Sequence, residues 1–446
     1  MREEFSKIGF ILSVVGGAVG LGNAWKFPTL VGMNGGFAFV LLYLLITITI
    51  GFAIFLAEIY MGKSSKKDPV NAYKTLAPNN KEKWKFAGFT MVSGILVLSF
   101  YLVILGWVIR YIFISLFALP KDIDSARAMF EGFVGSDLLG SIFFFFIAFI
   151  LTILVVSKGV KSGIEKLNVY AMPTLFILLV LMLLYSVSFD GFKEAFKFLF
   201  YADFSKLSVD SLLTALGLSF FTLCLGVGCI LTYAASLGDN VNPVTSSFYI
   251  VLINIAIGLM MGLIVFTFVF EYSGDPTQQG VGLVFFSLIT LFAKLGIVGN
   301  ILSFLFFLSL FFAGITSAIS MIEPFTFYLI NEYKFSRKKA LCYLGCFVFI
   351  LGSLCIMSLN LNFSQALNFG GKSFFDILDF ASSNVGLPVG AILSAIFVGF
   401  VIPKEKVKGF FMPFMKKEII FEIWYFMLKF VAPIAILIIA INQILA

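Results

Sequence analysis

The chain has 446 residues, of which 60% are hydrophobic and 12% are charged, and its formal net charge is +7. A soluble globular chain is about 45–50% apolar and about 25% charged, so this composition excludes a soluble globular protein. No histidine is present, which excludes His-based acid–base catalysis, a Ser-His-Asp triad and a histidine metal site. Apolar runs of about 20 residues recur along the whole length and predict an all-α, polytopic membrane protein.

Eleven membrane spans are predicted in chain order, as two sets of five and one extra helix. In residue numbers they are 8–31, 37–61, 86–117, 139–156, 164–187, 212–237, 244–270, 299–328, 340–357, 374–401 and 423–445. The connection 272–295 opens with Ser273-Gly274-Asp275-Pro276 and continues with an apolar stretch, 284–292, that is too short to span a bilayer. We expect this stretch to form a re-entrant or capping hairpin over an external vestibule.

Glycines interrupt the first span near its middle. The sequence there is Gly16-Gly17-Ala18-Val19-Gly20-Leu21-Gly22-Asn23. Lipid offers no hydrogen-bond partner to an interrupted helix, so free backbone at this depth must face protein or a polar cavity. The spacing of Gly16 and Gly20 by itself also fits close helix packing. Asn23, Lys26 and Pro28 favour a functional break, because an amide and a lysine inside a span need polar partners.

A second interruption lies in the sixth span, at Thr222-Leu223-Cys224-Leu225-Gly226-Val227-Gly228. Broken spans at matching positions of two halves indicate the substrate site of a transporter. Half-helix ends and unwound carbonyls also supply the oxygen ligands that sodium needs. The chain is therefore predicted to move a small solute by using ions.

Candidate oxygen ligands lie near both breaks. Thr222 belongs to the second break, Asn254 lies in the next span, and Thr316 and Ser317 are adjacent in the eighth. Either hydroxyl of the eighth span alone is better explained by a hydrogen bond to the carbonyl four residues earlier. Only their combination with the broken spans indicates ion binding.

Cysteine usage and charge distribution complete the picture from the residues. The five cysteines, Cys224, Cys229, Cys342, Cys346 and Cys355, all fall in predicted spans and are interpreted as small buried apolar residues without disulfides. The first apolar segment lacks a signal-peptide cleavage site and is expected to be retained. Lysine and arginine are roughly three times as frequent in the connections on the N-terminal side. This bias predicts a multi-pass protein of the cytoplasmic membrane with a cytoplasmic N-terminus and an external C-terminus.

Several motifs follow one another along the chain. They are Gly20-Leu21-Gly22-Asn23-Ala24-Trp25-Lys26-Phe27-Pro28 with Asn34-Gly35-Gly36, Ser162-Gly163-Ile164-Glu165-Lys166, Ala171-Met172-Pro173-Thr174-Leu175-Phe176, Phe220-Phe221-Thr222-Leu223, Phe312-Ala313-Gly314-Ile315-Thr316-Ser317 and Ser336-Arg337-Lys338. Over essentially the whole chain, this set resembles the neurotransmitter:sodium symporter family in its bacterial amino-acid transporter branch. The resemblance implies the leucine-transporter fold, with inverted repeats at approximately 8–190 and 208–401 around a midplane site. An extra helix at approximately 423–445 would complete a single transporter domain, 1–446.

The resemblance also implies two sodium sites. The first would use the carbonyl of Ala18 with the side chains of Asn23, Thr222 and Asn254, completed by the substrate carboxylate. The second would use the carbonyls of Gly16, Val19 and Ala313 with the hydroxyls of Thr316 and Ser317. A carboxylate shared with the first ion couples the two ligands, since each supplies part of the other's binding energy.

The substrate class is implied by Gly20, because the family's monoamine carriers have an aspartate at this position and its amino-acid carriers have glycine. The substrate carboxylate would be held by the amides of Leu21 and Gly22 and by the hydroxyl of Tyr101, which alone would be interpreted as an ordinary core tyrosine. The uncharged side-chain pocket would comprise Gly17, Val97, Phe221, Cys224, Val227, Ser317 and Met321, with Ala18 and Thr222 completing the substrate-binding set. A neutral, apolar or aromatic amino acid fits this pocket best.

Gates are implied in the same way. Lys26 and Asp379 match the external ion pair, with Phe221 as a lid above the substrate. The family usually has arginine at position 26, and lysine lacks its bidentate fork. Arg2 is the candidate cation of the inner gate. The family's usual inner-gate aspartate falls at Asn331, beside Glu332, and its usual tyrosine falls at Ser236.

Chloride dependence is left open by the sequence. Tyr43 matches one residue of the family's chloride site, but Leu218 replaces the usual glutamine. Gly258 stands where chloride-dependent members have serine and many bacterial members have an acid. Glu58 is an acid inside a predicted span and is therefore a functional candidate, although we interpret it as a structural hydrogen-bond acceptor near the unwound first span.

The leading hypothesis is sodium-coupled uptake of a neutral amino acid by alternating access, with the amino acid, sodium and the lipid bilayer as partners. Nucleic acid is not an expected partner, because the positive charge is concentrated in short connections. The alternative is a member of the same fold that senses amino acids and transports little. A membrane enzyme is disfavoured because the sequence offers no nucleophile–base set or metal cluster. An ion channel would not need a site that joins sodium to a carboxylate.

Overall fold

The computed structural model describes residues 4–201, 204–272, 274, 277 and 282–445. Its α-helices are α1 (Lys7–Ala18), α2 (Phe27–Met33), α3 (Phe37–Ile46), α4 (Phe52–Ser65), α5 (Pro69–Leu76), α6 (Lys81–Trp84), α7 (Val92–Ile114), α8 (Ile123–Ser136), α9 (Leu138–Ser157), α10 (Lys166–Ser186), α11 (Gly191–Phe200), α12 (Val209–Thr222), α13 (Cys229–Ala234), α14 (Pro243–Glu271), α15 (Ile289–Ala293), α16 (Ile297–Tyr333), α17 (Arg337–Leu359), α18 (Phe374–Asp379), α19 (Leu387–Ile396), α20 (Lys404–Met415), α21 (Glu418–Phe426) and α22 (Ala432–Leu445).

Shorter elements join these helices. The π-helical turns are η1 (Gly22–Lys26), η2 (Thr47–Gly51), η4 (Val160–Glu165), η6 (Leu283–Leu288), η7 (Phe380–Gly386), η8 (Phe397–Val401) and η9 (Met427–Val431), and the 3₁₀ turns are η3 (Lys85–Met91) and η5 (Phe204–Lys206). The strands β1 (Asn368–Phe369) and β2 (Lys372–Ser373) pair antiparallel, with Asn368 opposite Ser373 and Phe369 opposite Lys372. Two glycines with positive φ, Gly370 and Gly371, form the turn between them, as tight hairpins require.

Nine helical segments in the described residues are long and apolar enough to cross a membrane. They are Phe37–Ser65, Lys81–Ile114, Leu138–Ser157, Val160–Ser186, Pro243–Glu271, Ile297–Tyr333, Arg337–Leu359, Phe374–Val401 and Glu418–Ile438. Each corresponds to one predicted span. The first and sixth predicted spans are not in this set because both are interrupted. The all-α membrane architecture is confirmed, while the total of eleven spans stays a prediction.

Both interruptions occur where the sequence predicts them. In the first, α1 ends at Ala18 and the helical path resumes at Gly22. In the second, α12 ends at Thr222 and α13 begins at Cys229. Between α12 and α13 the backbone adopts positive φ at Gly226 (81°) and Gly228 (78°), a conformation that glycine adopts without the steric penalty of a β-carbon.

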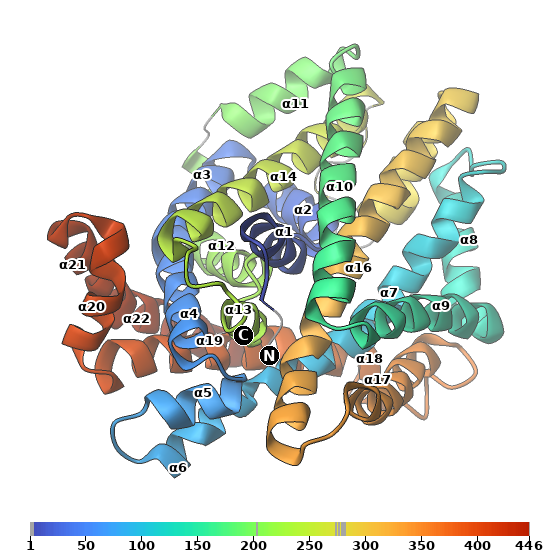
Figure 1. The fold of residues 1–446 in the computed structure, drawn as a ribbon. Coiled ribbons are helices and arrows are strands. Elements are labelled where there is room, and N and C mark those ends of the chain that lie inside the picture. The colour runs from blue at the N-terminus through green and yellow to red at the C-terminus, as the bar shows by residue number, and fades with distance from the viewer. Residues whose placement is uncertain (1–3, 202–203, 273, 275–276, 278–281, 446) are drawn as a thin grey trace.

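The two broken spans lie at the centre of the helical bundle (Figure 1). The first broken span, through α1, packs against α10, α13, α14 and α16, and α13 packs against α4. On one side of this centre, α9 and α17 pack on α7, while α20, α21 and α22 lie at the opposite edge in Figure 1. The freed backbone therefore faces protein and not lipid, as the bilayer requires.

Polar side chains fix where several helices begin. Ser6 accepts a hydrogen bond from the amide of Gly9 at the start of α1. The same N-cap contact is made by Asp68 for α5, Asn242 for α14, Ser336 for α17 and Ser373 for α18. Each cap satisfies amides that have no partner inside the helix.

The apolar stretch of the long connection forms a short buried helix, Leu283–Ala293. Phe285 is fully buried, and its ring lies 4.9 Å from that of Tyr111 and 6.2 Å from that of Trp107 in α7. This helix is too short to span, as expected, and besides these ring contacts with α7 it packs against α8, α14 and α16. Ser273, Asp275 and Pro276, at the polar start of the connection, lie outside the described residues.

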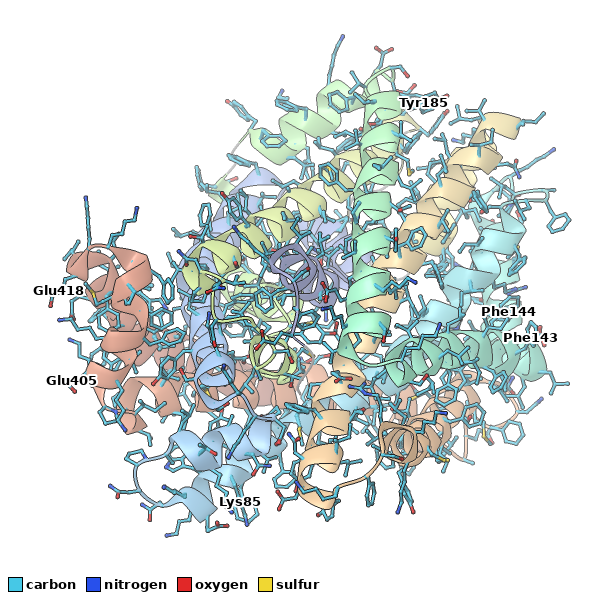
Figure 2. The ribbon with its side chains drawn as sticks, viewed as in Figure 1. Lys85, Phe143, Phe144, Tyr185, Glu405 and Glu418 are labelled. Carbon is cyan, nitrogen blue, oxygen red and sulfur yellow. The ribbon has the colours of Figure 1, made fainter. Side chains whose placement is uncertain are left out.

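The interpretation that all cysteines are buried is wrong for two of them. Cys224, Cys229 and Cys355 are buried, whereas Cys342 and Cys346 on α17 are exposed, and all five are free. An apolar residue in a membrane helix can face lipid, so hydrophobicity does not distinguish the core from the outer surface. Phe143, which is 58% exposed at the outer edge of α9, illustrates the same point (Figure 2).

Candidate functional site

A small cavity lies between the two breaks. Its volume is about 20 Å³, room for about one water molecule. Its lining comprises Gly17, Ala18, Gly20, Asn23, Val97, Tyr101, Phe221, Cys224, Val227, Ser317, Met321 and Leu387. The sequence singled out every one of these positions except Leu387, which begins α19. No charged side chain is in this lining, so the cavity matches an uncharged substrate side chain.

Three other predicted substrate residues adjoin this cavity without lining it. The amide of Leu21 donates a 2.9 Å hydrogen bond to the Tyr101 hydroxyl, which fixes the tyrosine beside the first break. A β-carbon on Gly22 would lie 2.3 Å from the Phe221 ring, so this glycine lets Phe221 approach the backbone closely. The Thr222 hydroxyl lies 3.0 Å from that of Tyr43.

The second break is held by two hydrogen bonds to other spans. The amide of Gly226 donates to Glu58 Oε1 at 2.8 Å, and the Cys224 thiol donates to the Gly17 carbonyl at 2.9 Å. The Cys224 contact joins the two breaks directly. Glu58 is 1% exposed and bonds the second break, whereas the sequence placed it near the first. This carboxylate compensates the free amide of an unwound turn, which is a structural role.

Two of the residues predicted for the first sodium site, Asn23 and Asn254, are in direct contact. Asn23 Nδ2 donates to Asn254 Oδ1 at 3.0 Å, and both side chains are buried. This pairing leaves Asn23 Oδ1 without a hydrogen-bond partner. Buried amide oxygens are nearly always satisfied, and hard cations take amide, carbonyl and hydroxyl oxygens as ligands. The amide oxygens of Asn23 and Asn254 are therefore suitable ligands for a sodium ion.

The residues predicted for the second sodium site also lie together. The Ser317 hydroxyl is 3.0 Å from the Gly16 carbonyl and 3.2 Å from the Val19 carbonyl. The Thr316 hydroxyl is 3.1 Å from the Ala313 carbonyl one turn earlier in α16. The break in the first span exposes the Gly16 and Val19 carbonyls to α16, and this convergence of oxygens also fits sodium. In the described residues, no group of three or more acidic or cysteine side chains could hold a metal.

At the predicted outer gate, Lys26 contacts the ring of Phe221 instead of the carboxylate of Asp379. The Lys26 ammonium lies 4.2 Å from the centre of the Phe221 ring, a cation–π contact. Asp379 accepts a 2.7 Å hydrogen bond from Ser383 and forms no direct ion pair with Lys26, both residues being described. Lysine is a point charge on a flexible stem, which allows it to bind the ring and not the carboxylate.

Around the predicted inner gate, Arg2 lies outside the described residues. Asn331 donates a 3.0 Å hydrogen bond to Asp68, the cap of α5, and the Ser236 carbonyl accepts from the amide of Phe5 at 3.0 Å. Lys66 pairs with Asp239 at 3.0 Å and lowers the pKa of this exposed carboxyl. Each contact joins two segments at the end of the molecule that carries α5 and α6.

The residues relevant to chloride lie beside the first candidate sodium site. Tyr43 reaches Thr222, as described above, and Leu218 is buried. A β-carbon on Gly258 would lie 3.7 Å from Asn23 Nδ2. Position 258 therefore faces the site, but in this chain it supplies no polar group.

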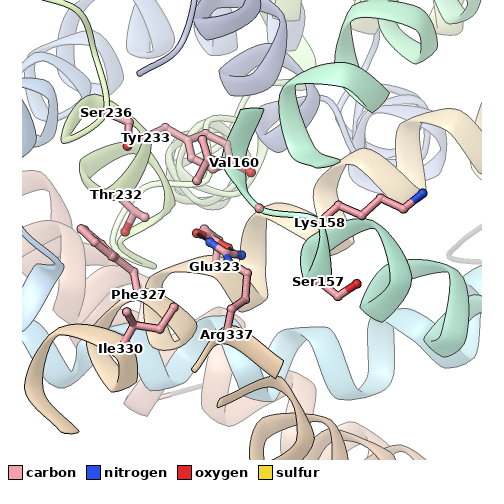
Figure 3. A pocket seen from close by; sticks show the side chains of 11 residues that line it. Ser157, Lys158, Val160, Thr232, Tyr233, Ser236, Glu323, Phe327, Ile330 and Arg337 are labelled. Atoms are coloured by element: carbon pink, nitrogen blue, oxygen red, sulfur yellow. Dashed lines mark hydrogen bonds and ion pairs between the residues drawn. The ribbon is translucent and has the colours of Figure 1, made fainter. Parts of the chain in front are cut away.

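A second, larger cavity of about 460 Å³ is lined in part by an ion pair whose acid is buried and whose arginine is partly exposed (Figure 3). Its lining comprises Ser157, Lys158, Gly159, Val160, Thr232, Tyr233, Ser236, Glu323, Phe327, Ile330 and Arg337. Arg337 binds both carboxylate oxygens of Glu323, at 2.8 and 2.5 Å, and donates to the Val156 carbonyl at 2.9 Å. The pair thus joins α16, α17 and α9. Glu323 is not among the residues predicted from the sequence, although an acid inside an apolar span is a usable signal.

Comparisons with known proteins agree over nearly the full length. Residues 2–126 and 130–446 match the model of the sodium:neurotransmitter symporter family. A sodium-dependent transporter of Bacillus subtilis, YhdH, is 35% identical over 443 residues, which cover 98% of this chain and 97% of that one. A sodium-dependent transporter of Haemophilus influenzae is 32% identical over 450 residues, with coverage of 98% and 97%. The crystal structure of MhsT in complex with L-phenylalanine superimposes with a TM-score of 0.89 at 34% identity, over 99% of this chain and 100% of that one.

Proposed function

The chain belongs to the sodium:neurotransmitter symporter family, and from that premise we propose that it takes up a neutral, apolar or aromatic amino acid together with sodium. Members of this family are sodium-dependent secondary transporters, so the chain is a multi-pass membrane protein that uses sodium and is not an enzyme. We further propose that the chain has two sodium sites and that transport is directed into the cell.

One observation carries the proposal: an uncharged cavity lies between the two broken spans, and the oxygens of both candidate ion sites lie close to it, at Asn23 and Asn254 and at Gly16, Val19 and Ser317. An apolar substrate side chain would contact Val97, Val227 and Met321. At about 20 Å³ the cavity is smaller than an amino acid, so binding requires the lining side chains to separate. The bound L-phenylalanine in MhsT supports an amino-acid substrate.

The first ion and the substrate would bind as a unit. The Ala18 carbonyl, Asn23, Thr222 and Asn254 would hold this sodium, and the substrate carboxylate would complete its ligands. Tyr101 and the amides of the first break would hold the other side of the carboxylate. Because the ion and the carboxylate share this contact, the affinity for each rises when the other is bound.

The second ion would connect the first span to the eighth. It would take the Gly16, Val19 and Ala313 carbonyls with the hydroxyls of Thr316 and Ser317. In the structure Ser317 donates to two of these carbonyls, so the ion would replace its proton as their partner. Sodium would then hold α1 and α16 together in the loaded state.

Alternating access requires a barrier on each side of the cavity. On the outer side Phe221, covered by Lys26, would act as the lid, with Asp379 free to pair with Lys26 in another conformation. On the cytoplasmic side we place the larger cavity and the Glu323–Arg337 pair, with the N-terminus in the cytoplasm and the C-terminus outside. Arg2 is proposed as a further cytoplasmic gate residue.

Uptake into liposomes tests the proposed function. The purified protein is expected to accumulate labelled phenylalanine or leucine only under an inward sodium gradient. Replacement of sodium by potassium should abolish accumulation, because potassium is too large for sites built for sodium. Uptake that is unaffected by this replacement would rule out the symporter, and binding without uptake would favour the amino-acid sensor.

Replacing Gly20 with aspartate is expected to abolish amino-acid transport. The β-carbon of the new side chain would lie 2.9 Å from both the Ser317 and the Tyr101 hydroxyl. Its carboxylate would also occupy the space proposed for the substrate carboxylate and repel it. Gly20→Ala separates these effects, because it adds the β-carbon without the charge, and it should retain part of the uptake. Intact phenylalanine uptake in Gly20→Asp would contradict the assigned substrate class.

A further inference from the structure

One buried amide in α10 has no role in the ligand sets described above. Asn168 is 0% exposed, and its Oδ1 has no hydrogen-bond partner. Its Nδ2 donates a 2.8 Å hydrogen bond to the carbonyl of Ile164, one turn earlier in the same helix. That carbonyl can only accept, so it fixes the amide orientation and directs the oxygen away from α10.

The free oxygen of Asn168 points at the first break. An ideal β-carbon on Gly16 would lie 2.0 Å from Asn168 Oδ1 and 2.9 Å from Thr316 Cβ. Gly16, Asn168 and Thr316 therefore meet at one point, where α1, α10 and α16 come together. The lack of a side chain at Gly16 is what lets the oxygen reach this point.

A purely structural role accounts for the amide nitrogen of Asn168 but not for its oxygen. The bond to Ile164 uses the amide nitrogen, and a serine or threonine could make the same bond, as Thr174 does to the Tyr170 carbonyl in α10 at 2.8 Å. The oxygen gains nothing from that bond. Leaving a buried acceptor without a partner is unfavourable, whereas a cation at this point would satisfy it.

We propose that Asn168 Oδ1 faces the second sodium site and supplies it with an additional oxygen from α10. This inference rests on the proposed function only in taking the site of Gly16, Thr316 and Ser317 as a sodium site. The ion would then contact three helices, α1, α10 and α16, instead of two. Asn168 would raise sodium affinity without contacting the amino acid.

Two substitutions separate the oxygen from the structural bond. Asn168→Ser can still donate to the Ile164 carbonyl, as hydroxyls do one helical turn apart, but its side chain is too short to carry an oxygen to Gly16. Asn168→Asp keeps the oxygen toward Gly16 and cannot donate to Ile164 when ionised. If Asn168 is an ion ligand, the serine variant should lose more sodium affinity than the aspartate variant. If Asn168 only forms the bond to Ile164, the aspartate variant should be the more impaired of the two.

The readout is the sodium concentration that gives half-maximal thermal stabilisation of the purified protein, in the absence of any amino acid and with choline as the balancing cation. We expect this midpoint to rise by about tenfold or more in Asn168→Ser, as when groups that orient metal ligands are lost, and to stay the same or fall in Asn168→Asp. Melting temperatures in choline alone report whether each variant is folded.

Two results would overturn the inference: a wild-type midpoint in Asn168→Ser, or equal damage in both variants. If the serine variant does not fold, the aspartate variant decides, since a raised midpoint in that protein contradicts a ligand role. Wild-type protein that sodium stabilises but that takes up no amino acid would refute the proposed amino-acid transport and leave this inference intact. Wild-type protein that sodium does not stabilise would refute both.

Discussion

Replacing Asn23 with alanine is expected to abolish sodium-dependent amino-acid binding at ordinary sodium concentrations. The substitution removes the free oxygen of Asn23 and also the 3.0 Å bond that orients Asn254, so two proposed ligands of the first ion are affected at once. The sodium concentration for half-maximal binding of labelled phenylalanine should rise by about 10- to 100-fold, the range typical for lost ligand support. A sodium titration of equilibrium binding measures this change.

Asn34 offers a matched control for this titration. Its amide caps the C-terminus of α2 by donating to the Leu30 carbonyl, and it accepts from Ser211. Asn34→Ala therefore removes an amide directly after the second half of the broken span, and the contacts that are lost, with Leu30 and Ser211, involve neither candidate ion site. We expect it to lower stability and leave the sodium midpoint unchanged. An unchanged midpoint in Asn23→Ala would show that Asn23 is not an ion ligand.

Replacing Gly226 with alanine is expected to prevent stable folding. Gly226 has φ of 81°, and a β-carbon there would lie 2.2 Å from the Leu387 carbonyl oxygen and 2.7 Å from the Ala391 nitrogen. Both neighbours are backbone atoms of α19 and cannot rotate away. Positive φ costs a non-glycine residue about 1–3 kcal/mol, and overpacking adds about 1–3 kcal/mol. Thermal unfolding followed by size-exclusion chromatography of detergent-solubilised protein measures the loss.

Gly217, in α12 just before the same break, is the control position. A β-carbon on Gly217 would meet nothing within 4 Å, so Gly217→Ala should be tolerated and, by helix propensity, could gain up to about 1 kcal/mol. Equal stability of the two alanine variants would contradict the close approach of α19 to the second break. A loss confined to Gly226→Ala would support it.

The positions of the membrane helices could be predicted from the sequence because a helix that crosses lipid needs about 20 consecutive, mostly apolar residues. Every long helix matches an apolar run, and both breaks were marked by glycine. The short amphipathic helices of the connections, such as α8 and α20, were not predicted. Polar residues fill their exposed faces and interrupt the apolar ones, so no long apolar run marks these helices in the sequence.

The site residues that the sequence identified are those that lie in or next to the glycine-marked breaks or in recognisable motifs. Leu387, Glu323 and Asn168 were missed because their importance depends on which distant segment they contact. Leu387 is an ordinary apolar residue until α19 is placed against Gly226. Glu323 and Asn168 are polar residues inside spans. Their neighbouring sequence does not indicate that Glu323 pairs with Arg337 or that Asn168 faces Gly16.

Ser317 takes part in both the small cavity and the cluster of carbonyls at the first break. Its hydroxyl has a single proton, so it cannot keep donating to the Gly16 and Val19 carbonyls once a cation binds them. Its proton would then turn toward another acceptor, while the oxygen stays beside the two carbonyls and binds the ion. Because Ser317 also lines the small cavity, the hydrogen bond that this wall offers to a substrate would differ between the empty and the sodium-bound protein. Occupancy of the ion site would thereby alter substrate binding through a single hydroxyl proton.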